Sequence, residues 1–155
     1  MQRPPTNSSI PIEQIQLPAP GLEQMQAEAR EAGFQFLETL LREWVSGKNR
    51  FDAAGEMLCG HFDQGVLVAI GGLNRDPFLS DPAVGRIRRV YVRREWRNRG
   101  IGGALLEKLL TAARKNFRSV RLRAENPSAA QLYERKGFTR IQSSSATHIL
   151  HFESP

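Results

Sequence analysis

A glycine-rich turn in the middle of the chain has residue types that can hold an anion. The turn reads RNRGIGG, and an apolar stretch with helical spacing follows it. Glycine lets the backbone come close to a ligand, and the first N–H groups of a helix have no intrahelical partner. The helix dipole adds a preference for negative charge. We therefore predict that phosphate binds at this turn, which comprises Arg97, Asn98, Arg99, Gly100, Ile101, Gly102 and Gly103.

Positive charge is concentrated next to this turn. From Arg86 to Arg99 the sequence has seven arginines and a single acidic residue, Glu95, which gives a local net charge of +6. The whole chain also carries +6, so its other basic and acidic residues balance. A local excess of this kind favours a polyanionic ligand. Nucleic acid is an alternative ligand, but only Tyr91 and Trp96 could serve as aromatic platforms, so no nucleic acid is expected as a partner.

The spacing of the glycines excludes two common phosphate-binding turns. A Walker loop needs Lys and then Ser or Thr after its last glycine, whereas Gly103 and Ala104 follow Gly102. The dinucleotide fingerprint needs Gly or Ala where this chain has Leu105, and it would start directly at the end of the strand. Neither template fits the turn.

The pattern that fits is Gln or Arg, any two residues, Gly, any residue, and then Gly or Ala. It runs from Arg97 to Gly102, directly downstream of a predicted strand. This pattern resembles the acyl-CoA-binding motif of the GNAT superfamily of N-acyltransferases. The resemblance implies that the N–H groups of the turn bind the pyrophosphate of coenzyme A. It also implies that the strand backbone pairs with the pantetheine arm, at Val90, Tyr91 and Val92.

A second stretch is similar to the other hallmark of the same superfamily. Residues from Asn126 to Phe138 match N-x-x-A-x-x-L-Y-x-x-x-G-F. By this resemblance Asn126 contacts the cofactor arm, although Asn before Pro127 is also a common turn former. Tyr133 takes the place of the general acid, although an aromatic residue packed on the inner face of a helix would look the same. Because a thiol has a pKa of about 8.5, a neutral phenol can protonate a departing thiolate.

The sequence is less clear about the other groups that amide formation needs. The oxyanion needs a preorganised N–H donor, and Val90 is the candidate. We expect a β-bulge in the strand next to Val90, around Arg88 and Arg89. The apolar residues of this strand are three positions apart from Ile87 to Val90 and then two apart from Val90 to Val92, as they would be if one extra residue were inserted. Those two arginines also stand where the superfamily often has its general base, so no base can be assigned. The remaining candidates are Glu56, His61, Glu95 and Glu125.

Hydrophobic spacing predicts a mixed α/β (α+β) fold around these motifs, in the order βααβββαβαβ. We expect a mostly antiparallel sheet of six to seven strands with helices on both faces, and local parallel pairing at the centre. Helices are expected within 22–45, interrupted at Gly33, from about Gly102, and after Ser128, with Ser128 as the cap and Gln131 as its returning partner. Strands are expected at 10–17, 57–62, 66–73, 86–92 and 119–124, with a terminal antiparallel pair at 138–142 and 147–152.

Length and composition indicate one globular domain, assigned to residues 10–155, after a polar, flexible tail at residues 1–9. The tail lacks the apolar core of a signal peptide or membrane span, so no membrane partner is expected. The single cysteine, Cys59, is expected in the core and fits a reducing, cytoplasmic location. No metal is expected, because no His/Cys cluster has ligand spacing. His61 is expected to be structural. His148 and His151 are expected to face solvent on a terminal strand, and the alternative is that they line the acceptor end of the cleft.

Together these features predict an N-acetyltransferase that uses acetyl-CoA as its cosubstrate. It would transfer the acetyl group directly to a primary amine of a small molecule or peptide. The alternative is a module of the same fold that binds acyl-CoA as a sensor or partner domain without turnover. The retained Tyr133 argues against that alternative, and the absence of an obvious base leaves it open. The sequence does not identify the acceptor, and a homodimer is also left open.

Overall fold

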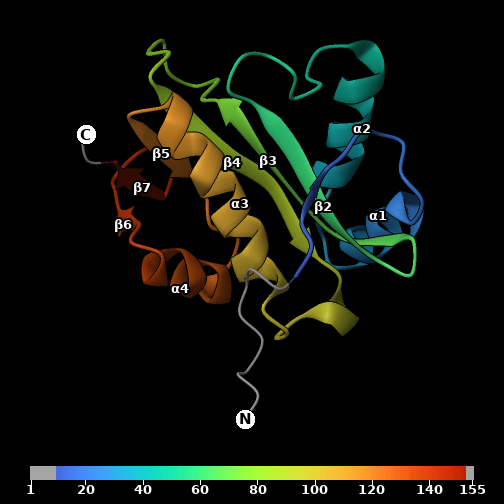
Figure 1. Cartoon of the computed structure of the whole chain (residues 1–155). Helices are drawn as coiled ribbons and strands as arrows, with labels where there is room; N and C mark the ends of the chain where they lie inside the picture. Colours follow the sequence, from blue (N-terminus) through green and yellow to red (C-terminus); the bar gives the residue numbers. More distant parts are fainter. Residues whose placement is uncertain (1–9, 153–155) are drawn as a thin grey trace.

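Within residues 10–152, which the computed structural model describes, seven strands form a sheet in the spatial order β1-β2-β3-β4-β5-β7-β6 (Figure 1). The tail expected at residues 1–9 lies outside this range. β4 and β5 are parallel, and the other neighbouring strands are antiparallel, which confirms the predicted mostly antiparallel fold. The strands are β1 (Glu13–Gln14), β2 (Met57–Asp63), β3 (Val66–Arg75), β4 (Val84–Val92), β5 (Ser119–Leu122), β6 (Thr139–Arg140) and β7 (His148–His151).

Helices cover both faces of the sheet, as predicted (Figure 1). The first two pack on one face and are separated at Gly33, whose φ of +90° lies in the left-handed region that favours glycine. The last two pack on the other face, and a short 3₁₀ turn at Arg94–Trp96 leads from β4 toward them. The helices are α1 (Leu22–Glu31), α2 (Phe36–Ser46), α3 (Ile101–Asn116) and α4 (Pro127–Arg135).

The leucines of α3 form the centre of one hydrophobic core. Their i, i+4 spacing puts Leu105 and Leu109 on the face that meets the sheet, and both are fully buried. They lie over Gly71 of β3, where an added Cβ would be 3.0 Å from Leu105 and 3.3 Å from Leu109. The glycine therefore lets α3 approach the middle of the sheet closely. A second core fills the space between the opposite face and α1 and α2.

Two local predictions need correction. The first strand is shorter than expected, because the prolines that flank it, Pro11 and Pro18, have no N–H to donate to a ladder. The cap of α4 is Asn126, whose side chain accepts a hydrogen bond from the N–H of Ala129 at 2.8 Å, and not Ser128. Proline at the first helical position fixes the helix start there, so the preceding residue takes the cap.

Candidate active site

A β-bulge interrupts the central strand, as the apolar spacing predicted. Ile70 pairs with Tyr91 and Gly72 pairs with Arg88, so two residues of β4 face Gly71 alone. Arg89, one of these two residues, has a φ of +61°, which is uncommon for a side chain of its size. A bulge of this kind takes one residue out of the ladder and bends the strand. The other residue is Val90, the predicted oxyanion donor.

β4 and β5 lie side by side only where they begin. Their register pairs run from Val84 with Ser119 to Arg86 with Arg121. β4 then continues to Val92 with no further pairing to β5 among the described strands. The bend at the bulge and the end of this pairing separate the two strands, and the sheet opens between them.

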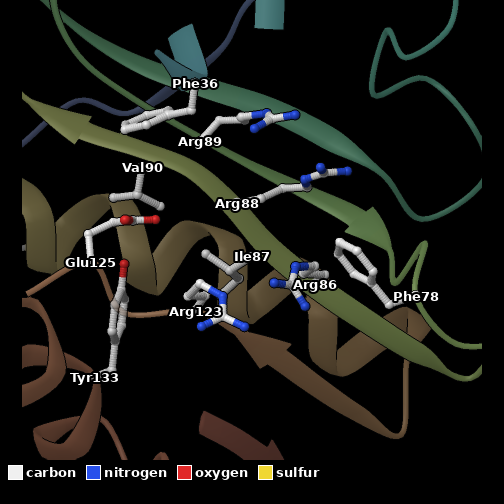
Figure 2. Close-up of a pocket in the computed structure, with 10 residues that line it drawn as sticks. All are labelled: Phe36, Phe78, Arg86, Ile87, Arg88, Arg89, Val90, Arg123, Glu125 and Tyr133. Atoms are coloured by element: carbon white, nitrogen blue, oxygen red, sulfur yellow. The ribbon is translucent and has the colours of Figure 1, made fainter. Parts of the chain in front are cut away.

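A pocket of about 250 Å³ lies where the two strands separate (Figure 2). Its walls come from β4, from the segment after β5, from α2 and α4, and from the loop before β4. Four of the lining side chains are arginines and one is a carboxylate, so the pocket is strongly cationic. The lining residues are Phe36, Phe78, Arg86, Ile87, Arg88, Arg89, Val90, Arg123, Glu125 and Tyr133.

Tyr133 projects from α4 into this pocket. The residue is 6% exposed, and its ring packs edge-on against Phe138 with the centroids 5.8 Å apart. Figure 2 shows its hydroxyl pointing toward the carboxylate of Glu125, on the same side of the pocket as Val90. Burial raises the pKa of Tyr133 to about 12, and the charge of Glu125 adds to the shift. The hydroxyl therefore keeps its proton at neutral pH and has one to donate.

Of the four candidates for a general base, only Glu125 lines the pocket. Glu56 accepts two backbone N–H hydrogen bonds, one of them from the loop before β2. The ring of His61 lies 2.7 Å from a backbone carbonyl of the N-terminal segment, which agrees with a structural role. Glu95 is exposed in the 3₁₀ turn. The structure thus brings one carboxylate and one phenol together beside the bulge.

The glycine turn lies at the start of α3, as predicted. Gly100 is the N-cap with a φ of +82°, and Asn98 has a φ of +63°. No side chain in the described structure caps this helix end, so its first N–H groups are open to a ligand. A Cβ added to Gly102 would lie 3.6 Å from Leu132 and 3.9 Å from Val92. This glycine therefore faces the space between α4 and the end of β4.

Arg97 folds back from the turn onto β4. Its Nε donates a hydrogen bond to the carbonyl of Val92 at 2.8 Å, and its guanidinium lies 5.4 Å from the centroid of the Tyr91 ring. The carbonyl of Val92 is one of the groups that the resemblance assigns to the pantetheine arm, so in this structure a side chain already engages it. Asn98 and Arg99, which the sequence also assigns to phosphate, are exposed beside it.

The side chain of Tyr91 is part of a partly buried polar network rather than of the pocket. Its hydroxyl donates to Glu28 of α1 at 2.6 Å, and Arg93 and the backbone N–H of Arg94 donate to the same carboxylate. Burial alone would raise the pKa of Glu28, but these hydrogen bonds and the charge of Arg93 lower it overall. Only the backbone of Tyr91 is then available for the predicted cofactor contact.

Much of the arginine excess is neutralised by carboxylates from other parts of the chain. Three of the seven arginines between Arg86 and Arg99 form ion pairs within 4 Å. These contacts could not be read from the local sequence, because each partner lies at least ten residues away. The pairs are Arg86 with Asp76, Arg89 with Glu43, and Arg93 with Glu28.

The histidines of the last strand differ from each other. His151 is exposed, as expected, but the expectation for His148 is wrong, because it is only 2% exposed. Its two ring nitrogens lie 2.7 Å from Thr147 Oγ1 and 2.8 Å from Glu134 Oε2, and these contacts satisfy a buried polar ring. Cys59 is fully buried, as expected, and burial raises the pKa of its thiol to about 11.

Sequence reasoning missed three residues around the pocket. Arg123 follows β5 and Phe78 lies in the loop before β4, and both line the pocket. Asp76, in the same loop, is 1% exposed and holds two arginines. No local pattern marks these residues, because tertiary contacts alone bring the loop to the sheet opening.

Residues 10–152 contain no group of three or more His, Cys, Asp or Glu side chains placed to hold a metal ion. None of the helices in that range combines the length and the apolar character of a membrane span.

Comparison with known proteins identifies the family. The sequence profile described as Acetyltransferase (GNAT) family matches residues 20–138. A protein from Exiguobacterium sp. 255-15 that is assigned as an acetyltransferase superposes with a TM-score of 0.82 at 28% identity, over 92% of this chain and 93% of that one. The chain belongs to the GNAT acetyltransferase family.

More distant structures share the fold. Ard1 from Thermoplasma volcanium has a TM-score of 0.66 at 21% identity, over 93% of this chain and 98% of that one. The ribosomal-protein-alanine N-acetyltransferase from Brucella melitensis has a TM-score of 0.65 at 20% identity, over 92% and 96%. At these identities the similarity concerns the fold alone.

Proposed function

We propose that this protein transfers the acetyl group of acetyl-CoA directly to a primary amine, with Tyr133 as the general acid. The observation that carries the proposal is the pocket at the opening between β4 and β5. Tyr133 and Glu125 meet there beside the bulge at Val90. An acid, a carboxylate and a displaced backbone segment are the groups that aminolysis of a thioester needs.

The residues present fit coenzyme A. The uncapped N-terminus of α3 would bind the pyrophosphate through the N–H groups of Ile101, Gly102 and Gly103, with Arg97, Asn98 and Arg99 beside it. The pantetheine arm would follow β4 from Val92 toward Val90, along the side where β5 no longer pairs. The amide of Asn126 would contact that arm, since its oxygen is used by the helix cap and its Nδ2 is not.

The proton balance of the reaction can be assigned to two side chains. An amine that arrives as its ammonium form gives a proton to Glu125, and its nitrogen then forms the C–N bond. The N–H of Val90 stabilises the oxyanion of the tetrahedral intermediate. As the C–S bond breaks, the thiolate of coenzyme A takes the proton of Tyr133, whose raised pKa keeps it protonated until that moment. The nitrogen of the new amide loses its second proton, which restores the phenol of Tyr133, and Glu125 returns the first proton to solvent.

An amine screen tests the proposal. Purified protein, acetyl-CoA and a panel of polyamines, aminoglycosides, amino acids and lysine peptides should release free thiol with at least one acceptor. Glu125→Gln should lower the rate in that assay by about 10²-fold or more without weakening acetyl-CoA binding. Tight binding of acetyl-CoA with no transfer to any amine would instead indicate a binding module without turnover.

A further inference from the structure

The pocket has opposite charges at its two ends. Figure 2 shows Glu125 and Tyr133 together on one side, and Arg86, Arg88 and the ring of Phe78 on the other. A positively charged amine fits the first end, because the carboxylate can accept its proton. The arginines at the second end instead favour a negatively charged group. A ligand that fills both ends must therefore carry a positive and a negative group.

Arg88 is the arginine at this end that has no partner. It is half-buried, and no hydrogen bond or ion pair to its guanidinium is found among residues 10–152, although it lines the pocket. Burial and, to a smaller extent, the neighbouring charges of Arg89 and Arg86 lower the pKa of Arg88 to about 10, although Glu43 and Asp76 act in the opposite direction. A desolvated, uncompensated cation of this kind gains when an anion enters.

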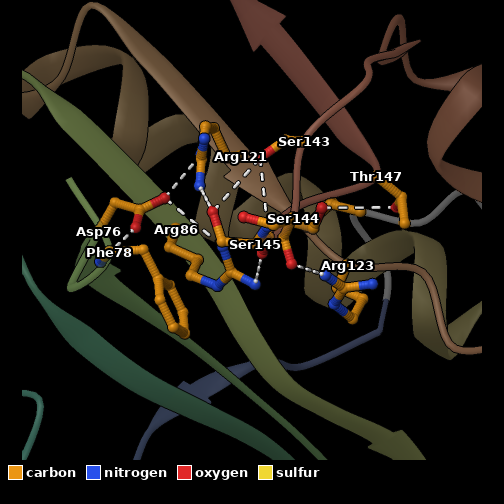
Figure 3. Close-up of polar contacts among 10 residues, drawn as sticks. Asp76, Phe78, Arg86, Arg121, Arg123, Ser143, Ser144, Ser145 and Thr147 are labelled. Carbon is orange, nitrogen blue, oxygen red and sulfur yellow. Dashed lines mark hydrogen bonds and ion pairs between the residues drawn. The ribbon is translucent and has the colours of Figure 1, made fainter.

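No carboxylate near Arg88 in the described part of the chain is free to act as that anion, because the few carboxylates in this region already pair with other arginines. Asp76 Oδ2 lies 3.5 Å from Arg86 Nη1 and 2.9 Å from Arg121 Nε, so one acid serves two buried arginines (Figure 3). The turn of Ser144 and Ser145 contributes only neutral oxygens, to Arg86, Arg121 and Arg123.

Unsatisfied nitrogen atoms remain on two arginines close to Arg88. Among the described residues, Arg89 Nε is buried without a hydrogen-bond partner, and Arg86 Nη1 makes no hydrogen bond and has only its ion pair with Asp76 at 3.5 Å. Arg89 has one ion pair, to Glu43 at 3.3 Å, through its Nη2. Buried polar atoms are nearly always hydrogen-bonded in native proteins, so an unmet donor beside an unpaired guanidinium indicates a missing acceptor.

We infer that the acetyl acceptor is a primary amine that also carries a compact oxyanion, a carboxylate or a phosphate, which binds to Arg88. The inference rests on the proposed acetyl transfer, and it defines the class of acceptor. The planar guanidinium binds such oxyanions in a bidentate manner, and a carboxylate or phosphate satisfies it better than a neutral amide does. At about 250 Å³ the pocket suits a small amino acid, an aminoalkyl phosphate or the end of a peptide.

Matched acceptors test this inference. Glycine, β-alanine and 4-aminobutyrate are compared with their primary amides, and O-phosphoethanolamine with ethanolamine. Each carboxylate and amide pair has the same length but differs in charge. The amine of each amide is the less basic one, which favours the amide chemically, so a preference for the acid must come from binding. The phosphate and carboxylate arms distinguish the two oxyanions.

The wild-type protein should show a kcat/KM that is about 10- to 100-fold higher for at least one anionic acceptor than for its neutral partner. Arg88→Gln should abolish this preference by raising KM for the anionic acceptor much more than for the neutral one. Arg88→Lys should restore part of the preference. Arg135→Gln removes an exposed arginine outside the pocket and should change neither acceptor. Equal use of acids and amides by the wild type, or an intact preference in Arg88→Gln, overturns the inference.

Two further measurements distinguish a failure of this inference from a folding defect and from a failure of the proposed function. Because Arg88 has no partner to lose, Arg88→Gln should unfold at the same temperature as the wild type or at a higher one, and a large decrease would make Arg88 a structural residue. If no amine is acetylated, the proposed function fails. The inference is then tested by calorimetry, in which the same anionic amines are titrated into the coenzyme A complex. Binding to the wild type that is lost in Arg88→Gln supports the anion site, and absence of binding to the wild type overturns the inference.

Discussion

The side-chain oxygen of Asn126 accepts a hydrogen bond from the N–H of Ala129 at 2.8 Å, so the residue assigned to the cofactor arm is also the N-cap of α4. The two possibilities that the sequence left open, a turn former and a cofactor contact, therefore use different atoms of one carboxamide. Its Oδ1 holds the start of the helix that carries Tyr133. Its Nδ2 is the atom that could reach a ligand.

Substitution at Asn126 should separate these two roles. Asn126→Asp keeps the capping oxygen and removes the N–H donor, so it should leave the unfolding temperature unchanged but weaken acetyl-CoA binding. Asn126→Ala loses the cap as well and should cost about 1 kcal/mol of stability. Chemical denaturation and calorimetry on the two variants measure both effects. Acetyl-CoA affinity that is unchanged in Asn126→Asp would limit this residue to the cap.

Tyr133→Phe should reduce the rate of acetyl transfer with little effect on folding. It removes one hydroxyl and keeps the ring that packs against Phe138. Loss of a general acid typically lowers the rate by about 10²–10⁴-fold, and the loss should appear in kcat rather than in KM for acetyl-CoA. A single-turnover assay is needed, because slow product release would hide the chemical step. Transfer by Tyr133→Phe at the parent rate would exclude Tyr133 as the acid.

The raised pKa of Tyr133 also predicts how stability depends on pH. A buried phenol with a folded-state pKa of about 12 stabilises the fold in its neutral form. This contribution is complete below the unfolded pKa of about 10 and is lost as the pH rises toward 12. Between pH 9 and pH 12 the wild type should therefore lose stability relative to Tyr133→Phe, by an amount on the order of 2 kcal/mol. Because both proteins contain Tyr91, its own titration cancels in the comparison, and parallel stability profiles would contradict the shift.

Gly102 should tolerate a small side chain for folding but not for binding. An alanine Cβ would lie at ordinary contact distance from Leu132 and Val92, and it should raise helix stability by about 0.5–1 kcal/mol. The same Cβ occupies the space where the turn is expected to meet the pyrophosphate. Gly102→Ala and the larger Gly102→Val should therefore bind acetyl-CoA progressively more weakly in calorimetry. A folded Gly102→Val with unchanged affinity would place the pyrophosphate elsewhere.

Two aspartates of one loop provide a matched test of charge burial. Asp76 is buried between Arg86 and Arg121, so Asp76→Asn leaves two buried guanidinium groups without an anion and should cost about 3–5 kcal/mol. Asp81 pairs with Arg118 at 3.5 Å on the surface, and Asp81→Asn should cost less than about 1 kcal/mol. Urea unfolding of both variants gives the comparison. Similar losses in the two would mean that Asp76 does not hold the buried arginines.

Features that depend on local spacing were predictable from the sequence. The glycine turn follows from the residues at a helix start, and the bulge follows from the odd step between Ile87 and Val90. The cap of α4 was not predicted correctly, because Ser128 with Gln131 matches a capping box as well as Asn126 matches a cap. Pro127 decides between them, since proline is favoured at the first position of a helix.

Features that depend on distant parts of the chain were not predictable. Asp76 and Arg121 are 45 residues apart, and nothing near either residue indicates that they touch. The position of Glu125 in the pocket has the same origin, because it follows from where β5 ends and α4 begins. Sequence patterns identified the glycine turn and Tyr133 as candidates, whereas only the folded chain shows the charge of the pocket.

Because β4 and β5 pair over a short stretch, the candidate active site lies at a weakly connected boundary within the sheet. Only three register pairs join these neighbouring strands, so the unit formed by β5, α4, β6 and β7 has a short backbone connection to the rest of the sheet. Such a boundary favours local opening as one cooperative unit. A bound molecule that touches both sides would hold the two halves together, so amide hydrogens of β5 and β7 should exchange more slowly when cosubstrate is present.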